Sequence, residues 1–428
     1  MYKTVLNPCI YHRFLFKCLV FLVMVLMLTN VAPPSPVAAR PWVKVTKERL
    51  LPDPSLKHTA WECARPPFGQ FDIISLHRVG HSQPGGRAVL FLPGTWEAAG
   101  WSGIRETSHN PYLFLADQGV DVWVAGFRNA NLPNMDYHRF AETGTDISAT
   151  GDWTYEVYRE DIRACVKKIQ RITGTSKIHL AGFSRGVDLL YIYASAYPED
   201  LAGLVVLDGD ILERQPMPEY ALDQTGFDQM VALFKAGLLS SEGCMGYTCP
   251  PQGENYPLLS QAFQSHYNDV QLAVRVPDAG VRAGDVLPGT FTNLSDYLAE
   301  HLYHLWGSGV FSNVQNGSVP RDILVRACGE FSRYWPAIQD FESIQMAVHE
   351  DVPYLDYDDN PIDLPCIAFL TDMFCPASNC LDTTLPRINQ NPDMTVHYLE
   401  GYGHLDVMFG TNAPADVSQP LLEWLNRH

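Results

Sequence analysis

The stretch Leu180–Val187, LAGFSRGV, places a serine between two glycines. It completes an apolar run that starts at Ser176 and leads into a segment with helical spacing, so a predicted strand ends and a predicted helix begins at Ser184. Flanking glycines relieve the crowding of a sharp turn that lifts such a serine into an exposed, strained position. There the N–H groups and dipole of the helix favour a developing anion. A structural Gly-Ser-Gly turn is the alternative, and the strand–turn–helix context favours a catalytic serine.

Short apolar runs and helical segments alternate on both sides of this turn. The predicted strands are Phe71 to Val79, Arg87 to Gly94, Val120 to Phe127, Ser176 to Phe183, Leu201 to Asp208, Asp363 to Asp372 and Met394 to Leu399. The predicted helices are Trp153 to Ile172, the segment from Ser184 to about Tyr197, and Ala413 to His428. Such alternation predicts an α/β fold, with a mostly parallel central sheet and helices on both faces. The first strand alternates apolar and polar residues and is predicted to be an exposed edge strand.

The alternation stops between about Gly209 and Asp351. This insertion is rich in aromatic residues and contains short amphipathic segments such as LSDYLAEHLYHLWGSGVF, which begins at Leu294. An insertion late in a parallel sheet lies above the carboxyl ends of the strands. We therefore predict a largely helical cap or lid at 209–351, between two parts of a core at 40–208 and 352–428. Its apolar underside would allow transient contact with a lipid interface, and a decorative surface domain is the alternative.

The first 39 residues have the pattern of an export signal. Lys3, Arg13 and Lys17 precede the apolar run Cys18–Leu28, and small residues end the segment at Ala39. This pattern predicts a signal peptide cleaved after Ala39, and hence a secreted or periplasmic protein. An uncleaved N-terminal membrane anchor is the alternative, although the apolar run is short beside the roughly 20 residues that a span needs.

Composition limits the classes of partner. The chain has 428 residues, a formal net charge of −18 and 46% hydrophobic residues, so it can bury a sizeable core. An acidic surface repels phosphate backbones, and we therefore expect no nucleic-acid partner. A small-molecule or lipid substrate fits this composition better.

Cysteine usage agrees with export. Eight of the ten cysteines lie beyond residue 39, and an even number in an exported chain predicts disulfides. The eight are Cys63, Cys165, Cys244, Cys249, Cys328, Cys366, Cys375 and Cys380. Two close pairs, Cys244/Cys249 and Cys375/Cys380, lie among turn residues and are suited to close small loops. Their spacing, with no histidine nearby, argues against zinc, so no metal site is expected.

A serine hydroxyl needs a histidine base that a carboxylate holds in place. His404 follows the last predicted strand and precedes the final helix, which is the position expected for the base. The acid should end an earlier strand, and two residues do so. Asp372 is favoured because it lies between the serine and the histidine in a turn after a strand. Asp208 is the alternative, since some enzymes of this kind place the acid one strand earlier.

Backbone N–H groups are expected to stabilise the oxyanion that forms on the substrate. One donor should be Arg185, the residue after the nucleophile. The other should follow the strand that ends in Leu92-Pro93-Gly94, where Thr95 is favoured and Trp96 is the alternative. The Arg185 side chain either contacts the substrate or the cap, or is a solvated residue at the helix start.

At these residues the chain resembles the α/β-hydrolases, and among them the acid-lipase branch of gastric and lysosomal lipases and their microbial relatives. The likeness covers roughly Phe71 to the C-terminus. It lies in FDIISLHRV at 71–79, DVWVAGFRNANLP at 121–133, RYWP around Tyr334 and GHLDVMFG around His404. The resemblance implies the α/β-hydrolase fold and hydrolysis of carboxylic esters.

The chain departs from the acid lipases at three places near the site. Pro93-Gly94 stands where that family has His-Gly, and Phe183 and Arg185 replace the His and Gln that flank the family's serine. The cap also matches poorly. The catalytic class is therefore better supported than the substrate.

The sequence thus predicts an exported serine esterase or lipase that works through an acyl-enzyme and needs no cofactor. An acyltransferase or thioesterase would use the same three residues. A non-catalytic binding protein would be expected to lack part of this set, and epoxide hydrolases and haloalkane dehalogenases would have Asp in place of Ser184. A peptidase is a further alternative.

Overall fold

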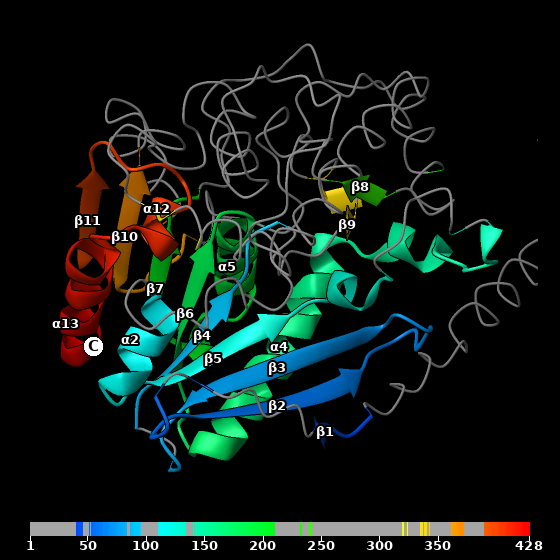
Figure 1. The fold of residues 1–428 in the computed structure, drawn as a ribbon, viewed down its shortest axis with the longest axis horizontal. Coiled ribbons are helices and arrows are strands. Elements are labelled where there is room, and N and C mark those ends of the chain that lie inside the picture. Colours follow the sequence, from blue (N-terminus) through cyan, green and yellow to red (C-terminus); the bar gives the residue numbers. More distant parts are fainter. Residues whose placement is uncertain are drawn as a thin grey trace, which may run out of the picture. The chain divides into compact units, whose positions relative to one another are not determined.

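The computed structural model describes residues 40–45, 51, 53–83, 86–95, 110–133, 140, 142–209, 232, 239–241, 319–320, 323, 334–336, 338–339, 342, 361–371 and 389–428. All the elements named below lie in one compact unit, Trp42–His428. Figure 1 shows their arrangement.

A nine-stranded sheet forms the centre of the fold (Figure 1). Its strands, in spatial order, are β1 (Val43–Val45), β2 (Lys57–Ala64), β3 (Ile73–Gly80), β5 (Asp121–Gly126), β4 (Ala88–Leu92), β6 (Ile178–Phe183), β7 (Leu201–Leu207), β10 (Cys366–Thr371) and β11 (Met394–Leu399). Pairing is parallel from β5 to β11 and antiparallel from β1 to β5 through β2 and β3. The predicted mostly parallel sheet is confirmed.

The prediction that the strand near Phe71 lies at the edge of the sheet is wrong. This strand, β3, pairs with β2 on one side and β5 on the other, and most of its residues are buried. β2 has the sequence KHTAWECA, whose mixed polar character gave no strand signal. β2 and the short β1 cover the edge that β3 was expected to form.

Helices cover both faces of the sheet (Figure 1). The helices are α2 (Pro111–Asp117), α4 (Tyr155–Thr173), α5 (Arg185–Ala196), α12 (Asp406–Phe409) and α13 (Gln419–Arg427). The short turns are η1 (Arg128–Asn131), η2 (Ser148–Asp152), η3 (Pro198–Asp200) and η7 (Pro414–Ser418), and a two-stranded sheet pairs β8 (Leu239–Ser241) with β9 (Tyr334–Pro336). α4 and α5 share one apolar core with the sheet, and α2 and α13 share the other.

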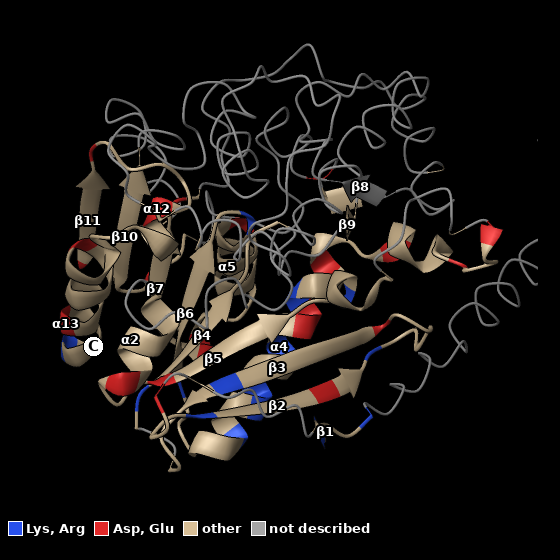
Figure 2. Cartoon of the chain, in the orientation of Figure 1, with Lys and Arg blue, Asp and Glu red and all other residues tan. Residues whose placement is uncertain are grey.

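Alternate residues of each parallel strand enter opposite cores, as the period of a strand requires. In β6, Leu180 packs with α4 and α5, whereas Ala181 and Phe183 pack with α2 and α13. The central strands β4, β6, β7 and β10 carry no Lys, Arg, Asp or Glu (Figure 2), because both of their faces are covered. α4 is bounded by Thr154, whose hydroxyl accepts from Val157 N, and by Gly174 in the left-handed region.

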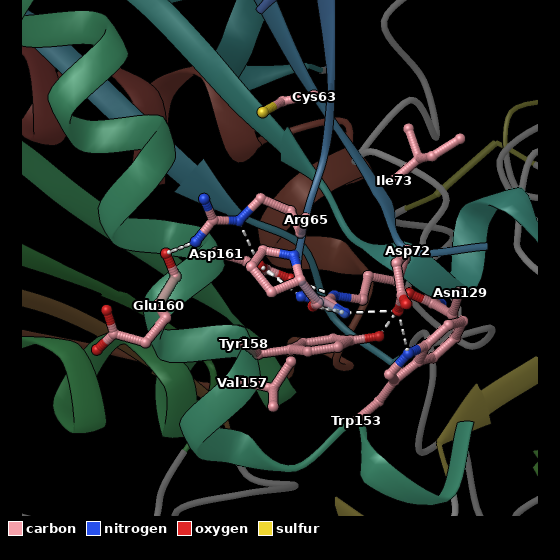
Figure 3. A network of polar contacts seen from close by, with 12 residues as sticks. Cys63, Arg65, Asp72, Ile73, Asn129, Trp153, Val157, Tyr158, Glu160 and Asp161 are labelled. Atoms are coloured by element: carbon pink, nitrogen blue, oxygen red, sulfur yellow. Dashed lines mark hydrogen bonds and ion pairs between the residues drawn. The ribbon is translucent and has the colours of Figure 1, made fainter. Parts of the chain in front are cut away.

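A buried ion network ties the connection between β2 and β3, and η1, to α4 (Figure 3). Arg128 Nε and Nη2 donate to the carboxylate of Asp161 at 2.6 and 2.9 Å, and Nη1 donates to Asp72 at 2.6 Å. Trp153 Nε1 also donates to Asp72, and Arg65 Nε to Asp161, both at 2.9 Å. Arg128, Asp72 and Asp161 are almost fully buried, so each charge depends on the others for compensation.

Replacing Arg128 with methionine should lower the free energy of unfolding by about 3–5 kcal/mol, because two buried carboxylates lose their shared cation. Urea unfolding followed by fluorescence measures this loss. Arg159→Met is the matched control on α4, because Arg159 contacts the largely exposed Glu156 at 3.3 Å. A surface pair of this kind contributes about 0–1 kcal/mol. Equal losses in the two variants would contradict the role given to the network.

Several predictions concern residues outside those described and stay predictions. These are the signal peptide at 1–39, the greater part of the cap at 209–351, and the pairs Cys244/Cys249 and Cys375/Cys380. Within the described ranges, no helix has the length and apolar character needed to cross a bilayer.

Two of the eight cysteines take no part in the predicted disulfides. Cys165 and Cys366 are buried free thiols, and the described part of the chain contains no disulfide. Burial raises the pKa of the Cys366 thiol to about 12. Both side chains lie in an apolar core, where a protonated cysteine packs as a small hydrophobic residue.

Candidate active site

The turn between β6 and α5 carries Ser184. Its backbone has φ 54° and ψ −125°, a strained combination for a residue with a Cβ atom. The flanking glycines make the turn possible. A Cβ on Gly182 would lie 2.4 Å from the carbonyl oxygen of Gly186, and a Cβ on Gly186 would lie 2.2 Å from that of Leu92. The first turn of α5 therefore packs directly on β6 and on the end of β4.

Gly186→Ala should lower the free energy of unfolding by about 1–3 kcal/mol, because the new methyl group meets backbone atoms that cannot move independently. Gly86→Ala is the matched control, since a Cβ there would meet no atom within 4 Å. Its effect should stay within about 0.5 kcal/mol. Urea midpoints compare the two variants, and a neutral Gly186→Ala would contradict the close packing of the turn.

Ser184 and Asp208 extend two neighbouring strands by one residue each. β6 pairs in parallel with β7, with Phe183 opposite Leu207, and Ser184 N donates to the Leu207 carbonyl at 3.1 Å. Asp208 has φ 43°, and its N donates to the Phe369 carbonyl of β10 at 2.8 Å. Among the described residues, three non-glycine residues have a positive φ, and Ser184 and Asp208 are two of them. Strain of this kind gathers at functional sites.

The Asp208 carboxylate is fully buried and held from two sides. Thr371 donates to Oδ1 from its backbone N at 2.7 Å and from its hydroxyl at 2.8 Å. On the other side, His404 Nδ1 lies 2.7 Å from Oδ2. A carboxylate at Nδ1 favours the tautomer that carries its proton there, which leaves Nε2 with a lone pair.

His404 is presented by a tight loop between β11 and α12. Asp406 accepts from Gly403 N at 2.7 Å and fixes this loop. The buried imidazole ring stacks on Phe183, with ring centroids 4.7 Å apart and 21° between the planes. Because Phe183 directly precedes Ser184, the stacking brings the ring beside the serine turn. This packing gives a physical role to one of the positions at which the chain departs from the acid lipases.

Of the two candidate acids, Asp208 is the one whose contact with His404 the structure describes. Asp372 lies outside the described residues, so its predicted role stays a prediction. The hydrogen bond supports Asp208, the alternative acid of the sequence analysis, as a candidate. The physical reason is topological: β7 lies directly beside β6, so the residue after β7 is next to the serine turn.

The predicted oxyanion loop also reaches the serine. A Cβ on Gly94 would lie 3.0 Å from Ser184 Cβ, so the chain after β4 passes directly beside the serine turn. Thr95 follows Gly94. Arg185, whose N–H is the other predicted donor, is the first residue of α5. Trp96, the alternative donor, lies outside the described residues. The favoured donors thus belong to the residue after Gly94 and to the residue after Ser184, and their role stays a prediction.

The interpretation of Arg185 as a solvated side chain is wrong. Only 13% of the side chain is exposed, and Nη1 donates to the Tyr155 hydroxyl at 2.8 Å. That hydroxyl donates to Asp188 at 2.7 Å, and burial raises the pKa of Tyr155 well above its usual value, so it acts as a neutral donor. Thr371 and Tyr155 were missed at the sequence level. A polar residue ending a buried strand could have indicated Thr371, whereas no local pattern connects Tyr155 with the serine turn.

The chain is similar to known proteins in sequence and in structure. No protein-family model matches the chain. A Caenorhabditis elegans protein named lipase lipl-1 is 23% identical over 385 residues, which cover 82% of this chain and 84% of that protein. A solved structure from Sulfolobus solfataricus, provisionally described as a lipase, aligns with a TM-score of 0.63 and 25% identity over 91% of this chain and 99% of that one. A potato epoxide hydrolase aligns with a TM-score of 0.46 and 12% identity over 83% and 96%, a likeness too low to bear on activity.

Proposed function

The chain has the α/β-hydrolase fold, and from that premise we propose that it is a serine hydrolase that cleaves carboxylic esters through Ser184, His404 and Asp208. The observation that carries the proposal is the 2.7 Å contact between His404 Nδ1 and Asp208 beside a strained serine turn. A carboxylate in contact with a histidine base, close to a serine, supplies the parts of an acyl-transfer site.

The chemistry follows from the positions of these groups. His404 Nε2 takes the proton of the Ser184 hydroxyl as the serine oxygen attacks the ester carbonyl. The negative charge on the carbonyl oxygen is stabilised by the N–H groups of Arg185 and Thr95 and by the amino end of α5. The tetrahedral intermediate collapses, and His404 gives its proton to the departing alcohol. In the second half of the reaction, His404 takes a proton from water as the water attacks the acyl-enzyme. His404 then returns the proton to Ser184, and the carboxylic acid is released.

Asp208 supports the base in both halves of the reaction. Its carboxylate holds the imidazole in one tautomer and compensates the positive charge that forms when His404 takes the proton. Thr371 fixes the carboxylate by two hydrogen bonds to Oδ1, so little reorganisation is needed when that charge appears.

Similarity to a nematode lipase favours an ester over other substrates of this fold. Ser184 also argues against epoxide hydrolysis, because a carboxylate nucleophile is expected at that position in enzymes that open epoxides. The acidic chain is suited to neutral or apolar esters rather than to phosphate-rich polymers.

A substrate panel tests the proposal. The chain from Arg40 is assayed with p-nitrophenyl esters of increasing acyl length, an emulsified triglyceride, a thioester and an anilide. We expect ester turnover with a defined acyl-length optimum and little anilide cleavage. Adding a primary alcohol tests acyl transfer, and ester products that form faster than free acid would identify a transferase. A folded protein that turns over none of these acyl donors would contradict the proposal.

A further inference from the structure

The guanidinium group of Arg185 connects three parts of the chain beside the serine turn. Its Nη1 donates to the Tyr155 hydroxyl at the start of α4 and, at 3.4 Å, to the Gln339 carbonyl. Its Nε donates to the Thr95 hydroxyl in the loop after β4, also at 3.4 Å. The carboxylate of Asp188 lies 4.0 Å from Nε and provides an opposite charge. The side chain thus bridges the predicted oxyanion loop, α4 and the segment that carries Gln339.

That segment is anchored to the core. We call residues 334–336, 338–339 and 342 the return segment, because they lie near the end of the insertion at 209–351. Gln339 Nε2 donates to the Trp153 carbonyl at 2.8 Å, and Glu342 accepts from Tyr155 N at 2.8 Å. Farther along, Asn129 Nδ2 donates to the Tyr334 carbonyl at 3.1 Å. Arg185 therefore connects Thr95 to a fixed support.

The chemistry of the side chain suits this role. A guanidinium is planar and presents several donors in a rigid fork, so it can hold separate acceptors in a fixed relative geometry. A lysine ammonium at the same place would be a point charge without this fork. The low exposure of Arg185 and the nearby Asp188 keep the group in one place.

We propose that Arg185 is a positioning residue whose guanidinium holds the Thr95 loop, and with it the Thr95 N–H, at the distance from Ser184 that the oxyanion requires. The inference rests on the proposed ester hydrolysis. It is separate from the role of the Arg185 backbone N–H, which a side-chain substitution leaves in place. The side chain acts through Thr95 and does not touch the reacting atoms.

Arg185→Lys and Arg185→Ala test the inference. We expect kcat to fall by about ten- to a hundredfold with KM within about twofold, because misplacing one group by about 1 Å can cost a hundredfold. A trifluoromethyl ketone, which forms a tetrahedral adduct with the serine, should bind more weakly by the same factor as kcat falls. Millimolar guanidinium should restore part of the activity of Arg185→Ala but not of Arg185→Lys.

Matched variants separate positioning from general destabilisation. Arg78→Lys removes the fork of another buried arginine, which pairs with Asp121 at 2.6 Å at the opposite end of the strands. Tyr155→Phe removes one support of Arg185, and Tyr193→Phe removes a similar buried hydrogen bond, to Asp200 at 3.0 Å. Arg78→Lys and Tyr193→Phe should keep kcat within about twofold, whereas Tyr155→Phe should share the kcat loss of the Arg185 variants.

Equal kcat losses in Arg185→Lys and Arg78→Lys would overturn the inference, and so would adduct affinity that stays at the wild-type value while kcat falls. Ser184→Ala is assayed in parallel. Activity in Ser184→Ala would remove the proposed function and this inference together. If Ser184→Ala is inactive but Arg185→Lys is fully active, the positioning role of Arg185 is contradicted and the proposed function stands.

Discussion

Ser184→Ala is expected to lower kcat for ester hydrolysis by at least about 10⁴-fold, because no other group can form the acyl-enzyme once the hydroxyl is gone. The fold should be preserved. Alanine keeps the Cβ atom, so the strain at φ 54° is about the same as in the serine protein. Steady-state rates with the best ester of the panel measure the loss, and the thermal midpoint checks the fold.

Ser148→Ala is the control for this substitution. Ser148 is exposed in η2 and has no place in the proposed mechanism. Its kcat should match that of the wild-type protein. Residual activity of Ser184→Ala above about one part in a hundred, in a preparation free of contaminating esterase, would contradict a serine nucleophile at this position.

Asp208→Asn is expected to lower kcat by about 10³–10⁴-fold, because an amide cannot hold His404 in the required tautomer or compensate its positive charge. The substitution is nearly isosteric, and asparagine tolerates the positive φ of 43° as well as aspartate does. The loss should therefore appear in kcat more than in stability. Rates across the pH range of the wild-type protein measure it.

Asp372→Asn is the matched comparison, because Asp372 was the acid favoured by the sequence. We expect it to keep kcat within about tenfold of the wild-type value, since His404 already contacts Asp208. The reverse order, with Asp372→Asn the more damaging change, would restore the preference taken from the sequence. In that case the 2.7 Å contact between His404 and Asp208 would support the fold and not catalysis.

The serine turn could be predicted from the sequence because its signal is local. Two glycines, a strand before them and a helix after them lie within one continuous stretch around Ser184. The position of His404 was predicted for the same reason, as it follows the last strand and precedes the final helix. The main layers followed from strong apolar periodicity in the central strands.

The choice of acid could not be made in this way. Asp208 and Asp372 both follow buried strands, and both precede His404 in the chain. What distinguishes them is which strand lies beside β6, and the parallel pairing of β6 with β7 is a long-range property. Thr371 holds Asp208 across β7 and β10, and that contact too depends on how the strands are arranged.

The contacts of Arg185 were missed for a related reason. Its partners Thr95, Tyr155 and Gln339 lie 90, 30 and 154 positions away in the chain. No local pattern brings them together. At the sheet edge, β2 was missed because its polar and apolar residues are mixed, since it lies near the margin of the sheet and not in its apolar centre.

The most direct test of the proposed mechanism is to locate the nucleophile chemically. The chain is treated with a fluorophosphonate, which modifies serines that are activated by a neighbouring base, and the labelled peptide is identified by mass spectrometry. We predict a single label on Ser184 in the wild-type protein, with slower labelling in Asp208→Asn and none in Ser184→Ala. A label on another residue, or undiminished labelling of Ser184→Ala, would contradict the assignment of Ser184 as the catalytic serine.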